Sequence, residues 1–393
     1  MKNKLSLFTL VGLILGIIFG LLLPGLTPQI KFIGTYYITI LKYMVVPVVI
    51  TTISVSIFNS TKLKSKLVFK TLLVFVSMFT ATFLLSSLLV TLINPSNGFV
   101  LVNEDWSGNT SIPGILGMLG NLIPKDLKKF ATGGNLFTVI LIAVVLGYVC
   151  SKFEKGEKVI NVIDKIKEFL FKVLGYYMYV TPFAVFSLIS NTIVEYGPIV
   201  LGVGAKYILT AYICAIGALL VVMILPILLI TKMSPITFIK KVYKIWMITL
   251  STCSSAASIP TNLECAKNIG VSEDIADTMI PLGTSFHKDG SVIGSVFKIM
   301  FLVYLFGATP SLGSVIATAL LATLLVTAVP VGGGTISEAL ILSMMGFPIE
   351  ALPILTIIAT IIDPPATLLN VVGDTSSSML VARVVDGKKW MKN

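Results

Sequence analysis

Long runs of apolar residues alternate with short polar segments along most of the chain. A helix needs about 20 apolar residues to cross the hydrocarbon core of a bilayer, and the runs recur often enough for about eight crossings. The clearest predicted spans cover residues 5–23, 33–58, 69–93, 134–150, 168–192 and 199–230. We therefore predict an all-α polytopic membrane protein.

Beyond residue 230 the apolar runs are interrupted by polar or helix-breaking segments. The interruptions lie at residues 251–258, 283–291, 330–334 and 363–365. Non-helical backbone at membrane depth is tolerated only where protein surrounds it or where it lines a cavity. The pattern predicts that the C-terminal part of the chain holds a binding region.

Composition agrees with a membrane protein, because 55% of the residues are hydrophobic and only 12% are charged. The net charge of +11 comes from short lysine clusters between apolar runs. Positive clusters of this kind face the cytoplasm, so we expect both termini to be cytoplasmic and the loop 94–130 to lie outside the cell. The clusters are Lys62, Lys64, Lys66 and Lys70; Lys152, Lys155, Lys158, Lys165 and Lys167; Lys240, Lys241 and Lys244; and Arg383, Lys388, Lys389 and Lys392.

Several other classes of function or segment are not indicated. Arg383 is the single arginine, which argues against nucleic-acid recognition. The four cysteines show no CxxC spacing, so neither a disulfide framework nor a zinc site is expected. The run from Leu5 to Leu23 lacks a small-residue cleavage site, and we interpret it as a retained first span rather than a signal peptide.

Four polar or glycine-rich motifs stand in a fixed order in the C-terminal half. They are Ser254-Ser255-Ala256-Ala257-Ser258-Ile259-Pro260, Pro281-Leu282-Gly283 with His287-Lys288-Asp289-Gly290-Ser291, Val329-Pro330 with Gly332-Gly333-Gly334, and Asp363, Thr367 and Asn370-Val371-Val372-Gly373-Asp374. Met44-Val45-Val46-Pro47 and Gly134-Asn135-Leu136 are weaker markers upstream. In order and spacing these motifs resemble those of the dicarboxylate/amino acid:cation symporter family, the glutamate transporter family, and the resemblance covers essentially the whole chain.

The resemblance implies about eight spans plus two re-entrant helical hairpins, arranged as a homotrimeric elevator transporter. Residues 1–68 would form scaffold spans 1 and 2, and residues 69–93 would form span 3 of the transport domain. Residues 94–198 would hold the outer loop and scaffold spans 4 and 5. Residues 199–393 would complete the transport domain with span 6, hairpin 1, span 7, hairpin 2 and span 8.

The resemblance also implies two sets of site residues and no catalytic residue. The substrate set is Ser254, Ser255, Ser291, Gly333, Asp363, Ala366, Thr367 and Asn370. The set for cation or proton coupling is Gly283, Ser285, His287, Lys288, Asp289, Asn370 and Asp374, of which Asn370 and Asp374 would bind a metal ion, sodium. The implied partners are a small amino acid, the lipid bilayer and further copies of the chain; no cofactor is expected beyond sodium or a proton as the coupling ion.

Residue chemistry supports part of this assignment. Thr367 and Asn370 follow Asp363 by four and seven residues, which places the three on one helical face. A carboxylate in an apolar run costs a few kcal/mol unless it is paired. In the family, the position of Asp363 binds the substrate's amino group; the alternative is an ion pair with Lys288 or Lys298. Backbone amides freed at the serine-rich tip, together with Ser255, could hold a carboxylate.

Three departures from the family pattern concern substrate and coupling. Ala366 stands where acidic-substrate members carry an arginine, and Cys253 replaces another polar or basic position, so a neutral amino acid is favoured. His287-Lys288 replaces an Asn-Met pair, and the Lys288 ammonium could take the electrostatic role of a sodium ion beside Asp289. His287 could instead be a structural residue.

The third departure lies in the predicted third span, where Phe75, Met78 and Phe79 stand at positions that bear hydroxyl groups in sodium-coupled members. Phenylalanine cannot bind sodium. These departures predict coupling that is weaker in sodium, uses protons, or is absent in favour of exchange. Glu338, also in apolar surroundings, could carry a proton or could be solvated in an outer vestibule.

We therefore expect a secondary active transporter of a small, neutral amino acid in the cell membrane, and no enzyme. A sodium-coupled symporter of dicarboxylates or acidic amino acids is the alternative. An ion channel is disfavoured because the second to sixth spans show no charged stripe. An intramembrane hydrolase built on Ser255, His287 and Asp289 is disfavoured because residues two apart do not face each other along a helix.

Overall fold

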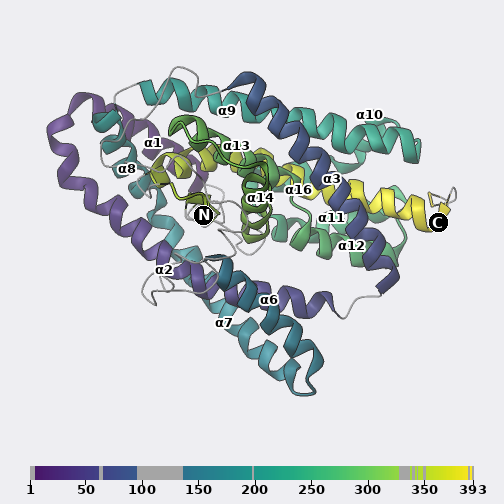
Figure 1. Cartoon of the computed structure of the whole chain (residues 1–393). Coiled ribbons are helices and arrows are strands. Elements are labelled where there is room, and N and C mark those ends of the chain that lie inside the picture. Colours follow the sequence, from purple (N-terminus) through teal and green to yellow (C-terminus); the bar gives the residue numbers. More distant parts are fainter. Residues whose placement is uncertain are drawn as a thin grey trace. The chain divides into compact units, whose positions relative to one another are not determined.

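The computed structural model describes residues 5–61, 65–94, 136–196, 199–326, 337–338, 341–342, 344–347, 351–387 and 390–391. All regular elements in these ranges are helices, and none of the described residues forms a strand (Figure 1). The α-helices are α1 (Leu5–Leu22), α2 (Thr27–Ser60), α3 (Ser65–Ile93), α6 (Leu136–Lys152), α7 (Gly156–Tyr177), α8 (Thr181–Tyr196), α9 (Ile199–Ala218), α10 (Pro235–Thr252), α11 (Ser255–Ile269), α12 (Glu273–Phe286), α13 (Asp289–Leu305), α14 (Leu312–Val326) and α16 (Leu352–Val385).

The lengths and apolarity of these helices agree with the predicted all-α polytopic membrane protein. In the described part of the chain, Phe69–Ile93 and Ala205–Thr231 are each long and apolar enough to cross a bilayer. Two bent helix pairs, Val11–Leu22 with Pro24–Tyr37 and Gly156–Tyr177 with Thr181–Val194, raise the number to four if each pair is one span. Shorter apolar helices occur at Val46–Asn59, Leu141–Lys152 and Leu312–Thr323.

The predicted span 168–192 is wrong as a single helix. The chain changes direction by 57° between α7 and α8, through a 3₁₀ turn at Met178–Val180. Pro182, the second residue of α8, has no amide hydrogen and cannot continue the hydrogen-bond ladder of α7. Hydropathy does not reveal such a bend, because the apolar residues at the end of α7 run on into those of α8, whereas the charged residues of α7 lie before its last turn.

The chain forms two compact units. The first comprises Met1–Thr61, Asn94–Leu209 and Lys298–Ile361, and the second comprises Lys62–Ile93, Thr210–Phe297 and Ile362–Asn393. The predicted assignment of ranges to a scaffold and a transport domain stays a prediction.

In the first unit, α1 packs against α8 along a seam of glycines (Figure 1). Gly12, Gly16 and Gly20 recur every four residues and so share one face of α1. A methyl group on any of the three would lie 2.7 Å or less from an atom of α8: the backbone oxygen of Pro182 or Ser190, or the side chain of Ile189. The seam thus requires residues without a side chain. On the neighbouring face of this unit, α2 packs against α6, α7 and α8.

In the second unit, α10 and α11 form a helical hairpin with a two-residue tip. Ser234 caps the start of α10 by accepting a hydrogen bond from the amide of Thr237 at 3.3 Å, and Pro235 follows at the first helical position. Cys253 ends α10 in the left-handed conformation, with φ 48°, and Ser254 starts α11. The predicted interruption at residues 251–258 is therefore a hairpin tip.

The same unit contains a broken helix and a helix that continues through two prolines. The sequence predicts an interruption at residues 283–291. In the structure α12 ends at Phe286 and α13 starts at Asp289, so only His287 and Lys288 are non-helical there. The interruption predicted at 363–365 is wrong, because α16 runs unbroken through Pro364 and Pro365. Proline has a helix-compatible φ, so the helix can continue, although each proline removes one backbone donor and its ring crowds the carbonyl four residues earlier. The interruption predicted at 330–334 lies outside the described residues.

The membrane-length helix Ala205–Thr231 contains π-helical turns, which are wider than α-helical ones, in the part that belongs to this unit. After α9, the backbone passes through π-helical segments at Leu219–Ile224 and Ile227–Thr231 on either side of Pro226. Segments of this kind are rare and cluster near functional sites.

Candidate functional site

The hairpin tip between α10 and α11 presents a helix N-terminus. The Ser254 hydroxyl accepts a hydrogen bond from the Ala257 amide at 3.3 Å, which is N-cap geometry. Ser255 is the first residue of α11 and is half-buried. The hydroxyl of the predicted substrate residue Ser254 is thus engaged as the N-cap of α11. Of the two serines, Ser255 is therefore the better candidate for a contact with the substrate.

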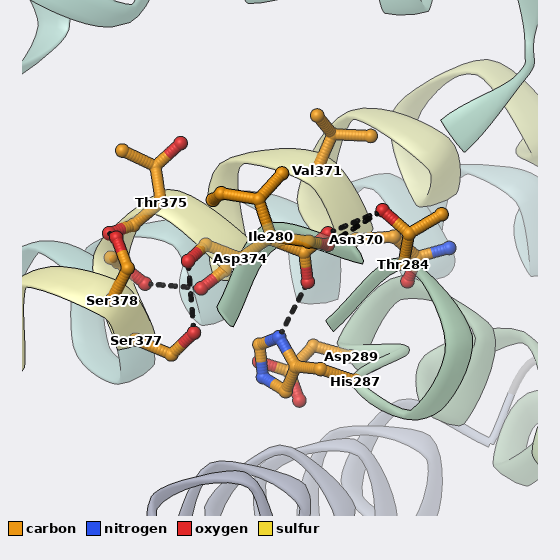
Figure 2. A network of polar contacts seen from close by, with 12 residues as sticks. Ile280, Thr284, His287, Asp289, Asn370, Val371, Asp374, Thr375, Ser377 and Ser378 are labelled. Atoms are coloured by element: carbon orange, nitrogen blue, oxygen red, sulfur yellow. Dashed lines mark hydrogen bonds and ion pairs between the residues drawn. The ribbon is translucent and has the colours of Figure 1, made fainter. Parts of the chain in front are cut away.

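Figure 2 shows the polar network around the break between α12 and α13. The His287 imidazole is 1% exposed. Its Nδ1 lies 3.3 Å from Oδ1 of Asp374 on α16, and its Nε2 lies 3.2 Å from Oδ2 of Asp289. The Phe75 ring of α3 stacks on the imidazole at a centroid distance of 4.7 Å. His287, Asp289 and Asp374, three of the predicted coupling residues, therefore lie together, and Phe75 covers them.

One step in the sequence-based rejection of a hydrolase is wrong. His287 and Asp289 do face each other, because the chain leaves the helical conformation at His287, with φ −98° and ψ 107°. The hydrolase hypothesis is nevertheless rejected, because the contacts of His287 with the described residues do not include a serine nucleophile. The described partners of His287 are Asp289, Asp374 and Phe75, so no serine is paired with the imidazole as a nucleophile would be.

Asp374 is also contacted from α12. The Thr284 hydroxyl donates to its Oδ2 at 3.3 Å. A methyl group at Gly283 would lie 2.4 Å from its Oδ1, so α12 and α16 approach as closely as a glycine permits. Ser285, the other predicted coupling residue in this turn, is half-buried.

Lys288 is buried beside two carboxylates of α16. Its residue is 6% exposed, and its ammonium group lies within electrostatic range of Asp374 and Asp363. The ammonium group forms no hydrogen bond or ion pair with the described part of the chain. The side chain in contact with Asp289 is the imidazole of His287. The predicted role of Lys288 as a substitute for sodium stays a prediction.

Asn370 of α16 joins the start of α13. Its side-chain oxygen accepts hydrogen bonds from the amides of Gly290 and Ser291 at 2.9 and 3.3 Å. Its side-chain amide donates to the Ser291 hydroxyl at 3.2 Å. A methyl group at Gly290 would lie 2.0 Å from the backbone oxygen of Ala366, so the two backbones are in direct contact there. The predicted substrate residues Ser291, Ala366 and Asn370 thus lie together where the start of α13 contacts α16.

Asp363 and Thr367 lie one turn apart on α16. Asp363 is exposed, Thr367 is buried, and the Thr367 hydroxyl donates to the Asp363 carboxylate at 3.4 Å. The predicted common face of Asp363, Thr367 and Asn370 agrees with this contact. Gly333 lies outside the described residues.

Sequence reasoning missed Asn262 on α11. Its side-chain amide donates to the carbonyl of Val371 at 3.0 Å, and its oxygen accepts a short hydrogen bond from Thr375. These contacts hold α11 against α16 two turns beyond the hairpin tip. The sequence offered no clear signal for it, because Asn262 is one of several polar residues in α11.

A second buried pair lies in the first unit. Nζ of Lys298 on α13 lies 2.9 Å from Oε1 of Glu338, and both side chains are buried. Glu338 is 0% exposed, so the alternative that it is a solvated vestibule residue is wrong for this structure. Lys298 thus pairs with Glu338.

Comparisons with known proteins agree with the sequence resemblance. The model of the sodium:dicarboxylate symporter family matches residues 5–384. The proton/sodium-glutamate symport protein of Geobacillus stearothermophilus is 26% identical over 392 residues, which cover 95% of this chain and 92% of that protein. The C4-dicarboxylate transport proteins of Deinococcus deserti and Edwardsiella ictaluri are 26% and 28% identical, over 97% of this chain and 89% and 92% of theirs.

Proposed function

Because the chain belongs to the sodium:dicarboxylate symporter family and is a secondary active transporter, we propose that its substrate is a small amino acid. The observation that carries this proposal is the pair formed by Asp363 and Thr367. Asp363 is an exposed carboxylate in an apolar helix, and Thr367 holds its orientation through the 3.4 Å hydrogen bond. An ammonium group is the natural partner of such a carboxylate.

We propose that the amino acid is neutral. Ala366 offers no donor for a side-chain carboxylate, and its backbone is packed against Gly290. A guanidinium at this position would supply two parallel hydrogen bonds to a carboxylate. The substrate's own α-carboxylate would bind near Ser255 and the first amides of α11, where the helix dipole favours an anion.

An acidic amino acid or a dicarboxylate is the second candidate. The related proteins are named as glutamate and C4-dicarboxylate transporters. One feature of this chain also supports it. Lys288 is a buried cation within electrostatic range of Asp363, and its ammonium group could take the place of the absent guanidinium.

The experiment that separates the two candidates is a thermal-shift screen of the purified protein with neutral, acidic and sulfur-containing amino acids and with C4-dicarboxylates. A ligand that binds the folded state raises its apparent stability by mass action. We expect saturable stabilisation by a neutral amino acid. Stabilisation by acidic compounds alone would reject the neutral assignment, and no stabilisation by any of these compounds would reject the proposed substrate class.

The transport cycle that we propose is of the elevator type, in a homotrimer with both termini in the cytoplasm. The resemblance of the C-terminal motifs supports the elevator, and the lysine clusters support the orientation. Crosslinking in native membranes and labelling of introduced cysteines from either side test these two features.

The coupling that we propose differs from plain sodium symport. His287 and Lys288 bring two cationic side chains into the predicted cation region. Proton coupling and exchange are the two alternatives. Uptake into proteoliposomes, driven in turn by a sodium gradient, a proton gradient or internal substrate, separates them. Uptake that requires a sodium gradient and is independent of pH would reject both.

A further inference from the structure

The two nitrogens of His287 face two different carboxylates. Nε2 lies 3.2 Å from Asp289 and Nδ1 lies 3.3 Å from Asp374, in a site that is closed to solvent. A neutral imidazole has one N–H and one lone pair, so it could donate to one carboxylate while directing its lone pair at the other. Only the imidazolium carries an N–H on both nitrogens. The Nδ1–Asp374 contact has hydrogen-bond geometry, whereas the 3.2 Å contact of Nε2 with Asp289 is an ion-pair distance without hydrogen-bond geometry. The imidazole ring therefore lies between two carboxylates, in the place where a cation would balance both charges.

The imidazole ring is held in place by its surroundings as well as by charge. Phe75 stacks on it at 4.7 Å with an interplanar angle of 15°. A methyl group at Gly373 would lie 2.7 Å from its Cε1, so the absence of a side chain at Gly373 leaves room for the ring. An aromatic ring facing a cation also stabilises it electrostatically.

The same residues offer a poor site for sodium, the ion in the name of the family. Sodium is a hard cation and needs several oxygen ligands. Oδ1 of Asp374 faces His287, and its Oδ2 accepts from Thr284. The side-chain oxygen of Asn370 accepts two backbone amides of α13. Phe75 provides no oxygen ligand. The Asp289 oxygens accept no hydrogen bond from the described residues, but the His287 ring lies 3.2 Å from Oδ2, in the space beside this carboxylate.

We propose that His287 is a built-in cation that takes the place of a transported sodium ion between Asp289 and Asp374. Lys288 adds a second positive charge near Asp374, so two carboxylates are matched by two cationic side chains without an added ion. The carrier would then bind its substrate without sodium in this region. This inference rests on the proposed transport function and specifies how it is driven.

The test measures sodium binding by the purified full-length protein, with no substrate present. Thermal unfolding is recorded in sodium, potassium and choline chloride at equal ionic strength, together with equilibrium dialysis against ²²Na⁺. For the wild type we expect equal melting temperatures in the three salts and no saturable ²²Na⁺ binding. A saturable, sodium-specific rise in Tm or saturable ²²Na⁺ binding by the wild type would overturn the proposal.

Three variants complete the test. His287→Asn removes the cation and supplies an amide oxygen, so we expect it to gain a saturable, sodium-specific rise in Tm. His287→Lys keeps a cation and should stay insensitive to sodium. Asp277→Asn, which removes an exposed carboxylate of α12 that pairs with Lys267, controls for a general effect of charge. A folded His287→Asn protein without a sodium response would contradict the proposal; if that variant does not fold, the wild-type ²²Na⁺ measurement decides alone.

These readouts separate this inference from the proposed function. Sodium binding is measured without transport, so a protein that binds no sodium and also transports no amino acid would leave the built-in cation standing and reject the substrate class. A protein that transports a neutral amino acid and binds sodium in this region would support the proposed substrate class and reject the built-in cation.

Discussion

The side-chain oxygen of Asn370 accepts the backbone amide of Gly290 at 2.9 Å, so a residue of α16 caps the first turn of α13. The cap comes from a helix 80 residues away in the sequence. This hydrogen bond therefore holds the candidate substrate residues of α16 next to the break between α12 and α13.

Asn370→Leu should destabilise the protein by about 1–3 kcal/mol, because it leaves the buried amides of Gly290 and Ser291 without an acceptor. Asn370→Asp keeps the acceptor and loses only the donor to Ser291, so its loss should be smaller. Chemical denaturation in detergent, followed by tryptophan fluorescence, measures both. Equal stability of the leucine variant and the wild type would contradict the capping role.

Gly290→Ala should disrupt the site, because the added methyl group would lie 2.0 Å from the backbone oxygen of Ala366. Gly294→Ala is the matched control on the same helix, since nothing lies within 4 Å of a methyl group there. Replacing a helical glycine by alanine should stabilise the control by about 0.5–1 kcal/mol. Melting temperatures and substrate-induced shifts of the two variants check the contrast; similar losses in both would argue against a close backbone contact.

Removing one partner of the buried Lys298–Glu338 pair should cost about 3–5 kcal/mol, because the other charge stays buried without its counterion. Lys298→Met and Glu338→Gln should each be strongly destabilising, and the double variant should recover part of the loss. The exposed pair Lys244–Glu264, with a 2.8 Å contact, is the control, and its removal should leave stability close to that of the wild type. A double-mutant cycle from denaturation curves gives the coupling. Additive losses would show that the two side chains act independently.

Asp363→Asn should abolish substrate-induced stabilisation and uptake with little change in the melting temperature of the free protein, because the carboxylate is exposed. Thr367→Val should weaken substrate binding by roughly fivefold, since a lost hydrogen bond of about 1 kcal/mol corresponds to this factor. Titration of the thermal shift with substrate measures both effects. If Asp363→Asn binds the substrate normally, the carboxylate does not bind its amino group.

Ala366→Arg should shift substrate preference towards acidic amino acids, because a guanidinium provides a bidentate partner for a second carboxylate. Ala366→Leu, which adds bulk without charge, is the control. Competition of each amino acid for uptake in proteoliposomes gives the preference. An arginine variant that folds and keeps the wild-type preference would show that this position does not face the substrate.

Several features of the site could be predicted from the sequence because they are local. The helix ends at Ser254 and at Phe286 follow from serine caps and from a polar stretch in an apolar run. The placement of Phe75 near the coupling residues is different, because it is not local and was implied by the family resemblance; its ring lies against the His287 imidazole.

Other features depend on distant parts of the chain and could not be predicted. The contact between His287 and Asp289 needs the backbone to leave the helix at one residue, whereas residues two apart in a continuous helix point away from each other. Which side chain, His287 or Lys288, lies beside Asp289 depends on side-chain direction, which sequence spacing does not give. Asn262 was missed because its partner, the Val371 carbonyl, belongs to another helix. The helix through Pro364 and Pro365 survives although the local rule predicts a break there.

The glycine seam between α1 and α8 has a consequence for how the protein responds to its environment. Gly12, Gly16 and Gly20 carry no group that can gain or lose a proton, and the atoms that they approach belong to the backbone or to aliphatic carbon. Acidification, salt and a membrane voltage therefore find no charge to act on at this contact, whereas the cluster of His287, Asp289 and Asp374 contains three titratable side chains. We expect the α1–α8 seam to stay unchanged under conditions that alter the charge of the cluster, and a bulkier residue at one of the three glycines to loosen it.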